Sequence, residues 1–273
     1  MSEPYTVDDL LYLMSRLRDP DGGCPWDQKQ TFQSIVPHTL EEAYEVADAI
    51  ERQDWNHLND ELGDLLFQVI FYAQLGTEQQ RFDFSTIVSN LVEKLIRRHP
   101  HVFPEGRLDS RRSDGLLSDA EIKQNWEAIK QQERGGKESR EPARVLDDVP
   151  RTLPALSRAA KLQKRAAQVG FDWHETESVL DKMEEELAEL REAIRSGDKA
   201  AVADEMGDMI FAQVNLARHL GVNPENAVRG TNSKFERRFS FVEDRVRASG
   251  RGWADFSLAE LDSFWDEAKK EGL

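Results

Sequence analysis

The sequence predicts an all-α protein, and three observations support this prediction. Apolar residues recur at three- and four-residue spacing through most of the 273-residue chain, which is the period of an amphipathic helix. No run of alternating apolar and polar residues is long enough to build a sheet. Residue types that begin and end helices stand at the borders of the periodic stretches.

The predicted helices fall into two groups along the chain. In the first half the helical period covers Val7–Arg18, Leu40–Arg52, Trp55–Leu75 and Phe84–Arg98. In the second half it covers Leu153–Val169, Ser178–Ile194, Lys199–Leu220, Pro224–Ser249 and Ser257–Lys270. Ser257 is a predicted N-cap because Glu260 follows three residues later, and Gly76 and Gly221 stand where helices are expected to end.

Residues 104–149 differ in composition from the rest and divide the chain into two halves. Most of this stretch is polar, charged and rich in Gly and Pro, as expected of loops. Within it, residues 118–133 predict one amphipathic helix capped by Ser118. We expect an N-terminal domain over residues 1–140, a linker over 104–149 that contains this helix, and a C-terminal domain over 147–273.

Charge and cysteine content exclude several functional classes. The 36 Lys and Arg against 52 Asp and Glu give a net charge of −16, so we expect no direct nucleic-acid binding. Cys24 is the only cysteine, which excludes an intrachain disulfide and fits a reducing cytoplasm. The longest apolar run, Leu65–Phe71, is too short to span a bilayer, and residues 1–15 lack the basic start of a secretory signal. The sequence therefore predicts a soluble cytoplasmic protein with no membrane association.

The two halves repeat the same acidic pattern. EEAYE at 41–45 aligns with EELAE at 185–189, and DELGDLLF at 60–67 aligns with DEMGDMIF at 204–211, both at an offset of 144 residues. Further matches follow in the same order, at offsets of 140 and 139 residues: Lys94 with Lys234, Arg98 with Arg238, Trp126 with Trp265, and Lys130 with Lys269. Three matching blocks in one order indicate a duplicated domain rather than a chance similarity between charged amphipathic helices.

The spacing of the acidic residues predicts a metal site. Residues three and four apart share one face of a helix, so Glu186 lies with Glu189, and Glu205 with Asp208. The turn at 196–198 reverses the chain, and two antiparallel helices would bring the four carboxylates together. Like charges ~4 Å apart repel by about 4 kcal/mol at an effective dielectric of 20, and a divalent cation removes this conflict. Carboxylates without His or Cys favour Mg²⁺ or Mn²⁺.

A lone E-x-x-E on a helix is more often a solvated face than a metal site. Here the pattern occurs twice, and Gly63 and Gly207 sit between the second-helix carboxylates. Gly inside a helix costs about 1 kcal/mol relative to Ala, so we expect a close-packed neighbour at each glycine.

Basic and aromatic residues near the acidic helices suit a nucleotide, although each also has a structural interpretation. Lys234 and Arg238 are four residues apart and could bind polyphosphate oxygens, or could form ion pairs on a surface helix. Trp265 and Lys269 could offer a stacking face and a further cation, or the Trp could close the core. The segments CPWD (24–27) and GFDW (170–173) are gates, base contacts or structural turns.

Together these motifs resemble a known family, the all-α nucleoside triphosphate pyrophosphohydrolases, and in particular its two-domain bacterial MazG proteins. The similarity covers nearly all of the chain and includes LRDPDGGCPWDQKQTF, RRHPHVF, GFDW and NLARHLG besides the acidic repeat. It implies two tandem MazG-like domains with a core of the four-helix-bundle type, completed by a homodimer. It also implies Mg²⁺-dependent hydrolysis of nucleoside triphosphates to monophosphate and pyrophosphate, with broad base tolerance and a house-cleaning role in nucleotide pools.

Carried over residue by residue, the resemblance places the principal site in the second half. The implied metal ligands are Glu186, Glu189, Glu205 and Asp208, and Glu185 joins them in the catalytic set as the residue that could take a proton from the attacking water. The implied nucleotide contacts are Lys182, Asn232, Lys234, Arg238, Trp265 and Lys269.

The first half offers a possible second site with two departures. Its matching residues are Glu42, Glu45, Glu61, Asp64, Lys94, Arg98, Trp126 and Lys130. Lys182 corresponds to His38 and Asn232 to Val92, so this half lacks a cation and a polar side chain that would lie beside the phosphates. We expect weaker nucleotide binding there.

Two alternatives remain open at the level of the sequence. One is a narrower enzyme of the same superfamily, specific for dUTP or for phosphoribosyl-ATP, because the sequence does not reveal the residues that recognise the base. The other is a non-enzymatic helical regulator that binds a nucleotide or a partner protein through a vestigial metal site. Intact acidic tetrads in both halves argue against the regulator.

Overall fold

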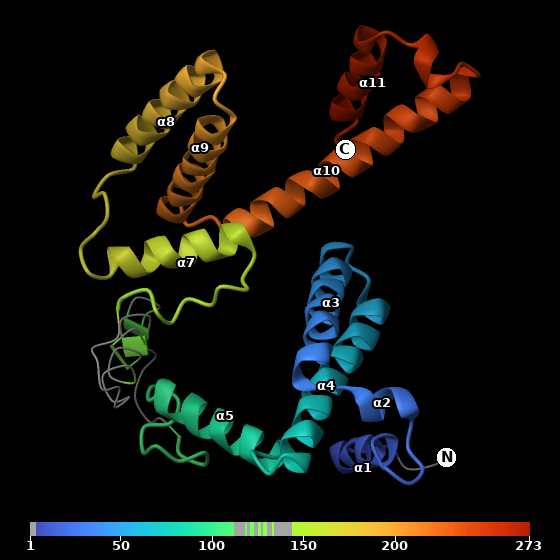
Figure 1. Ribbon diagram of the computed structural model, residues 1–273, viewed down its shortest axis with the longest axis vertical. Coiled ribbons are helices and arrows are strands. Elements are labelled where there is room, and N and C mark those ends of the chain that lie inside the picture. The colour runs from blue at the N-terminus through green and yellow to red at the C-terminus, as the bar shows by residue number, and fades with distance from the viewer. Residues whose placement is uncertain are drawn as a thin grey trace. The chain divides into compact units, whose positions relative to one another are not determined.

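The computed structural model describes residues 4–111, 118, 121–122, 125–126, 128–129, 133 and 144–273. Over these residues the chain is helical and has no strand, which confirms the all-α prediction. The chain divides into two compact units, Met1–Glu138 and Ser139–Leu273 (Figure 1). None of the helices in the described ranges has the length and apolar character needed to cross a membrane.

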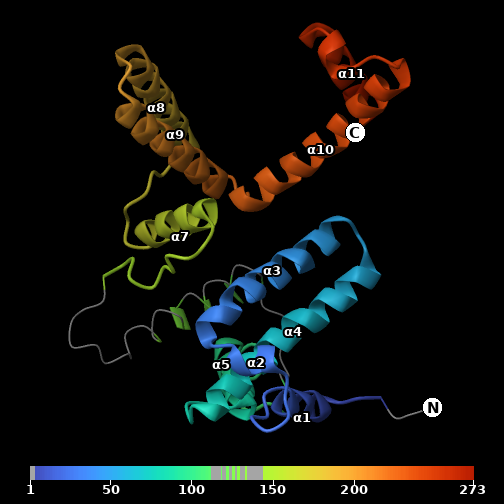
Figure 2. The same cartoon turned by 45° about the vertical axis from the view of Figure 1, so that its right-hand side comes forward.

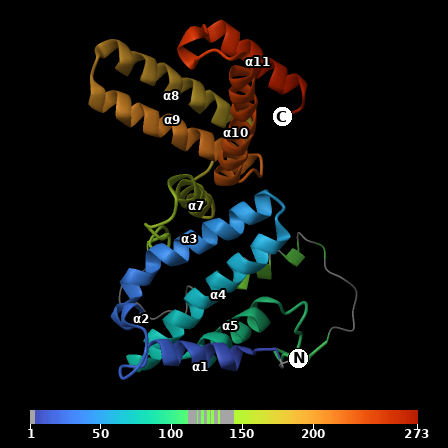
Figure 3. The same ribbon diagram turned by 90° about the vertical axis from the view of Figure 1, so that its right-hand side faces the viewer.

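The first unit is built on an antiparallel helix pair. Helices α3 (Phe32–Glu51) and α4 (Trp55–Glu78) form this pair, α1 (Val7–Leu17) and the short α2 (Pro25–Lys29) pack at its lower end, and α5 (Phe84–Arg98) follows α4 (Figure 3). The core of the unit forms where α1, α3 and α4 meet, and consists of Met14, Ile35, Ile70, Phe71 and Leu75. The core therefore lies at the end of the pair away from the turn that joins α3 to α4.

The second unit contains a similar pair. Helices α8 (Thr176–Ser196) and α9 (Lys199–His219) run antiparallel, and α7 (Ala155–Ala167) packs against α9. The long α10 (Pro224–Ser249) leads away from the pair, and the 3₁₀ turn η1 (Trp253–Asp255) returns the chain so that α11 (Leu258–Lys270) packs on the far half of α10 (Figures 1 and 2). Gly197 adopts a left-handed conformation (φ +74°) at the α8–α9 turn, and the Asp198 carboxylate caps α9.

Helix α3 begins earlier than the sequence predicts, at Phe32 instead of Leu40. Thr31 and Ser34 form a reciprocal capping box that starts the helix. Pro37 lies inside the helix, where proline removes a backbone hydrogen bond. Ile35 is only 1% exposed and packs in the core of the unit, so its burial holds this turn in helical form despite the proline.

Four predicted helix signals have different outcomes. The prediction that Gly76 ends a helix is wrong: Gly76 lies within α4, and a Cβ there would come within 2.6 Å of Phe82. The residue is glycine because that ring packs against the helix backbone. Gly221 does follow the end of α9 with φ +70°, and the Ser257–Glu260 capping box is present. Ser118 also caps as predicted, since its hydroxyl accepts from the Glu121 N–H.

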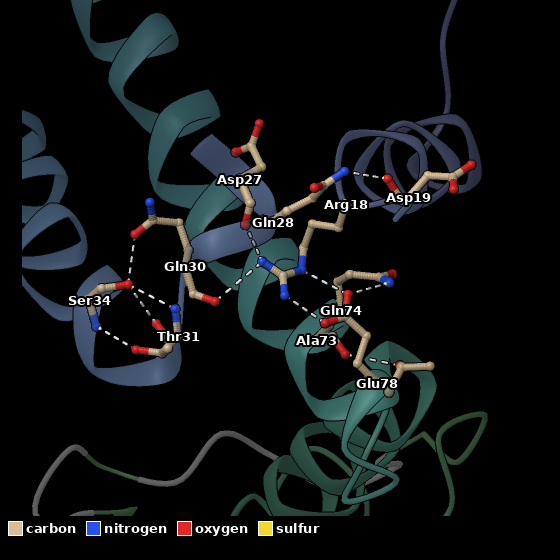
Figure 4. A network of polar contacts seen from close by, with 11 residues as sticks. Arg18, Asp19, Asp27, Gln28, Gln30, Thr31, Ser34, Ala73, Gln74 and Glu78 are labelled. Atoms are coloured by element: carbon tan, nitrogen blue, oxygen red, sulfur yellow. Dashed lines mark hydrogen bonds and ion pairs between the residues drawn. The ribbon is translucent and has the colours of Figure 1, made fainter. Parts of the chain in front are cut away.

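Arg18 ties together the lower end of the first unit (Figure 4). Its side chain is 7% exposed, and its Nε and Nη2 donate to the two carboxylate oxygens of Glu78 at 2.7 and 2.6 Å. Its Nη1 donates to the carbonyl oxygens of Asp27, which lies within α2, and of Gln30, which is the C-cap of α2. One guanidinium therefore links α1, α2 and α4.

We expect Glu78→Gln to destabilise the first unit by about 1–2 kcal/mol at pH 7, because a charge-assisted bidentate pair is lost. Arg18 lowers the pKa of Glu78, so the ionised carboxylate stabilises the folded state. This contribution is complete above the unfolded pKa of about 4.3 and is lost as pH falls through the lower folded pKa. Hydrogen exchange of α1 and α4 in the intact protein at pH 7 and pH 3.5 measures the effect.

Asp48→Asn is the control, because it removes an exposed pair with Arg52 on α3. Equal losses of protection in the two variants, or a Glu78→Gln effect that persists undiminished in acid, would contradict the assigned role of the Arg18 pair.

Candidate metal and nucleotide site

The α8–α9 pair brings predicted carboxylates into one cluster. Oxygen atoms of Glu186 on α8 and of Glu205 and Asp208 on α9 all lie within 4.8 Å of one another. Glu186 is 5% exposed, Glu205 is half-buried and Asp208 is exposed, so the cluster opens on one side. Three of the four predicted ligands therefore meet, as the spacing predicts for antiparallel helices.

Glu189 lies outside this group of three but still acts on it. Partial desolvation raises the pKa of Glu205, and repulsion from Glu189, Glu186 and Asp208 raises it further. Glu189 is the first of these charges, so its carboxylate belongs to the same electrostatic neighbourhood. A group of acids whose ionised forms repel one another is the arrangement that a divalent cation stabilises.

Lys182 contacts the cluster directly. Its Nζ lies 2.8 Å from Glu185 Oε1 and 2.7 Å from Glu186 Oε1. These two carboxylates, Glu185 first, hold the pKa of Lys182 well above its usual range. The ammonium is therefore fixed at the rim of the cluster, where the resemblance places a phosphate contact. Glu185 lies outside the group of three, with a side chain that is 57% exposed.

The first unit repeats the cluster on α3 and α4 with a different choice of three. Oxygen atoms of Glu42, Glu45 and Glu61 lie within 4.8 Å of one another, and Asp64 lies outside that group. Desolvation raises the pKa of Glu42, and the charge of Asp64 is the next cause. Desolvation and the charge of Glu45 likewise raise the pKa of Glu61. Both units therefore crowd acidic groups at the same place in the helix pair.

The groups around the two clusters differ. In the first unit, Gln68 Nε2 lies 3.5 Å from Glu42 Oε1, and His57 Nδ1 lies 3.2 Å from Glu61 Oε1. His38 takes the place of Lys182, packs edge-on against the Trp26 ring and lies 3.7 Å from Glu41. A permanent cation at the rim of the second cluster is thus replaced in the first by a weaker base.

Apart from Lys182, the predicted nucleotide contacts of the second unit lie on α10 and α11, away from the cluster. Arg238 Nε donates to Leu273 O at 2.7 Å, and its guanidinium lies over the Trp265 ring. Trp265 also contacts the Phe235 ring, and Lys269 pairs with Asp266. Asn232 and Lys234 are exposed on α10. Within one chain, the structure therefore groups these residues with one another and not with the carboxylates.

The corresponding residues of the first unit lie on α5 and in the linker. Arg98 and Arg97 both pair with Glu133, at 2.6 and 2.7 Å, and Arg98 first holds the pKa of Glu133 at about 2. Lys94 is half-buried on α5. Trp126 lies in a helical part of the linker, and Lys130 lies outside the described residues. Glu133 therefore already forms an ion pair with Arg98, the arginine that is expected to bind phosphate.

The expected close-packed neighbours of Gly63 and Gly207 are not found among the described residues. A Cβ at either position would meet no atom within 4 Å. Apolar side chains beside the glycines are exposed: Leu62 and Leu66 on α4, and Met206 and Ile210 on α9, are all at least 40% exposed. The space at the glycines is open within the chain.

A pocket beside the second cluster involves residues that the sequence analysis did not place in the site. Its lining includes Phe171, Trp173, Asn215 and Arg218 together with the cluster residue Glu186. GFDW left a gate, a base contact and a turn open as possibilities, and Asn215 and Arg218 occurred only within the NLARHLG motif. Two features of the sequence could have indicated these residues. One is the pair of aromatic residues on either side of Asp172, and the other is the pair of polar residues, Asn215 and Arg218, on the largely apolar second half of α9.

Comparisons with known proteins match this architecture. The family model of the MazG nucleotide pyrophosphohydrolase domain matches twice, over residues 30–103 and 174–242. The nucleoside triphosphate pyrophosphohydrolase of Escherichia coli (strain K12) is 48% identical over 269 residues, covering 98% of each chain. The nucleoside triphosphate pyrophosphohydrolase/pyrophosphatase MazG of Thermotoga maritima is 40% identical over 262 residues, or 96% of this chain and 95% of that relative.

We expect each cluster to bind a divalent cation through its carboxylates, and Mn²⁺ paramagnetic resonance titration measures this. Glu205→Gln and Glu189→Gln should each weaken one class of Mn²⁺ site at least about tenfold, because each removes an oxygen ligand. Glu192→Gln, which removes an equal charge from an exposed position on α8, is the matched control. If Glu192→Gln weakens binding as much, the ion responds to net charge alone and the cluster is not a ligand set.

Proposed function

The chain belongs to the MazG nucleotide pyrophosphohydrolase family, and we propose that it hydrolyses nucleoside triphosphates to monophosphate and pyrophosphate. We propose Mg²⁺ as its cation, with Mn²⁺ as a substitute, broad base tolerance and a house-cleaning role in nucleotide pools. The observation that carries the proposal is the acidic cluster on α8 and α9, where three carboxylates lie within 4.8 Å of one another with Lys182 at the rim.

The donor set fits Mg²⁺ better than a softer metal. Every candidate ligand in either group is a carboxylate, and Mg²⁺ prefers hard oxygen donors while it keeps some of its waters. Desolvation and then repulsion from neighbouring carboxylates raise the pKa of Glu205, and a cation would compensate that repulsion. We assign Glu186, Glu189, Glu205 and Asp208 as the residues that hold the ion, including Glu189 because its charge is the first that acts on Glu205.

Different residues of the chain contact different parts of the triphosphate. When bound, the cation supplies Lewis acidity at the phosphate oxygens. Lys182 is fixed 2.7 Å from Glu186 Oε1 and can transfer one of its hydrogen bonds to a phosphate oxygen. Lys234 and Arg238 neutralise charge on the departing pyrophosphate. The water oxygen forms a bond to the α-phosphorus while the bond from the α-phosphorus to the oxygen that bridges it to the β-phosphorus breaks. The monophosphate gains the water oxygen, and the pyrophosphate leaves with the bridging oxygen.

Glu185 is our candidate for the residue that accepts the proton of the attacking water. Its carboxylate lies outside the group of three ligating oxygens and is 57% exposed, so it is free to face water rather than the ion. Its hydrogen bond to Lys182 at 2.8 Å holds it in place beside the cluster. General bases of this kind typically contribute 10²–10⁴-fold in rate.

We assign most of the turnover to the second unit. The first unit has His38 in place of Lys182, and Glu133 already engages Arg98. A triphosphate entering the first unit must therefore displace a carboxylate from Arg98, without the permanent cation that the second unit offers. The first unit then serves mainly in dimerisation or regulation.

We also propose that the protein is a homodimer, and that the second copy supplies the phosphate contacts of α10 and α11. Leu62, Leu66, Met206 and Ile210 are exposed around two glycines that leave the helix backbone open. Helix pairs with such apolar faces complete a bundle by pairing with a second copy. Arg238 and the carboxylate cluster, separate within one chain, would then meet across the interface.

We expect Glu205→Ala to remove nearly all pyrophosphate release with ATP and with a pyrimidine triphosphate, and Glu61→Ala to leave most of it. The reason is that the second cluster has Lys182 where the first unit has His38, and that Glu133 engages Arg98 in the first unit. Glu192→Ala, at an exposed position one turn beyond Glu189 on α8 and outside the group of three carboxylates, should behave as wild type. Purified variants of equal helicity are compared at saturating Mg²⁺.

Equal losses from Glu61→Ala and Glu205→Ala would mean that both sites work or that they are coupled. A larger loss from Glu61→Ala would reverse the assignment. Wild-type protein that releases orthophosphate rather than pyrophosphate would overturn the proposed reaction.

The dimer is tested by sedimentation and by mixing inactive chains. A species of about twice the 31.3 kDa chain mass is expected at micromolar concentration. If each site is shared, refolded mixtures of Glu205→Ala and Arg238→Ala chains should recover about a quarter of wild-type activity, because half of randomly paired dimers carry one intact site of two. A monomer in sedimentation, or no recovery in a mixed dimer, would contradict the shared site.

A further inference from the structure

A pocket of about 460 Å³ opens in the second unit against the acidic cluster. Its lining includes Lys182 and the cluster residues Glu186 and Asp208. Phe171 and Trp173, from the segment between α7 and α8, also line it. Small-molecule sites typically enclose ~300–1,000 Å³ and combine mostly apolar walls with a few polar groups. One pocket thus joins a phosphate-binding rim to an aromatic wall.

The aromatic wall is held in place from α9. Gly170 has φ +87° and turns the chain after α7, which sets the direction of the segment that follows. The Asp172 carboxylate accepts hydrogen bonds from Arg218 and from His219 Nε2, the latter at 3.1 Å. Because Asp172 is anchored between them, Phe171 and Trp173 are placed on either side of a fixed point at the pocket.

These two aromatic side chains remain largely in water. Phe171 is 81% exposed and Trp173 is 44% exposed, although both line the pocket. A flat aromatic ligand that entered the pocket would remove this surface from water and could stack on the rings. Stacking of nucleobases on aromatic side chains is favourable for every base, because each base has a π-face.

Several polar groups of the lining are already engaged within the protein. Arg218 donates to Asn215 Oδ1 at 2.7 Å as well as to Asp172. Gln163 Nε2 donates to Phe211 O at 2.8 Å, and Gln163 Oε1, which has no partner among the described residues, is buried. Few hydrogen-bonding groups are therefore left to read the edge of a ligand.

From this geometry we propose that the pocket holds the nucleobase of the substrate, with Trp173 and Phe171 as its stacking residues. The proposal rests on the function proposed above, because the triphosphate is what the adjoining cluster would bind. It extends that function to a recognition mode: the base is bound by stacking and apolar contact, without selection of its hydrogen-bonding edge. Trp173 and Phe171 are thereby assigned to nucleotide binding.

The first test measures binding of AMP and of ribose 5-phosphate, which lacks the base, by calorimetry in Mg²⁺ buffer. In wild-type protein AMP should bind at least tenfold more tightly than ribose 5-phosphate. Trp173→Ala should weaken AMP binding about tenfold, the effect expected of losing one stacked ring, and leave ribose 5-phosphate unchanged. Trp173→Phe, which keeps an aromatic face, should restore most of the affinity.

Trp253→Ala is the matched control, because Trp253 is 45% exposed in the same unit but stacks on Phe239 near the far end of α10. It should bind AMP as wild type does. Phe171→Ala is the second variant should Trp173→Ala fold poorly, since a side chain that is 81% exposed contributes little to the core. Equal affinities of wild type for AMP and ribose 5-phosphate would overturn the proposal. So would a Trp173→Ala variant that loses both ligands equally.

A second measurement separates this inference from the proposed function. Wild-type hydrolysis of ATP and of ribose 5-triphosphate tests the reaction, and Trp173→Ala should raise KM for ATP about tenfold without changing the rate with ribose 5-triphosphate. Wild-type protein that hydrolyses neither substrate sinks the proposed reaction while the AMP comparison still decides the pocket. Hydrolysis of both by wild type, with an unchanged KM for ATP in Trp173→Ala, sinks the pocket alone.

Discussion

The mutual repulsion of carboxylates on two antiparallel helices is the constraint on which the rest of the structure depends. Oxygen atoms from three acidic residues lie within 4.8 Å of one another in each unit. Desolvation first, and then repulsion from neighbouring carboxylates, raises the pKa of Glu205 in one unit and of Glu42 and Glu61 in the other. Such crowding persists only when apolar packing holds the helices together. Buried Leu190, Ala193 and Val214 do this along α8 and α9, and the Gly197 turn fixes the reversal.

The residues that contact the acidic cluster differ between the two units. In the second unit a lysine ammonium spans Glu185 and Glu186, and in the first His57 and Gln68 approach the acidic groups. The first cluster therefore has an imidazole and an amide as neighbours where the second has an ammonium. Paired with the engagement of Arg98 by Glu133, this makes the two clusters chemically unequal although their backbones follow one pattern.

Helical periodicity predicted most of the helices, because the period reflects which residues of a helix are buried. It did not predict the helix boundaries that are set by contacts outside the helix. The start of α3 is set by Ile35 packing across the unit, and the glycine at 76 by a ring six residues away, neither of which has a periodic signal. For the site, spacing placed the acidic residues on facing helices but could not choose which three side chains meet. Spacing also put Lys234 and Arg238 on one helix face without indicating that α10 leads away from the cluster (Figure 1).

The shared wall of the pocket and the cluster bears on which phosphate would be attacked. Glu186 and Asp208 belong both to the acidic group and to the lining of the pocket that we assign to the base. A nucleoside seated there reaches the cluster through the phosphate bonded to it, the α-phosphate, while the outer two phosphates extend toward further cations. Hydrolysis between the α- and β-phosphates then follows from the position of the nucleoside. Because stacking would position every base alike, the proposed geometry predicts one cleavage site together with a wide choice of bases.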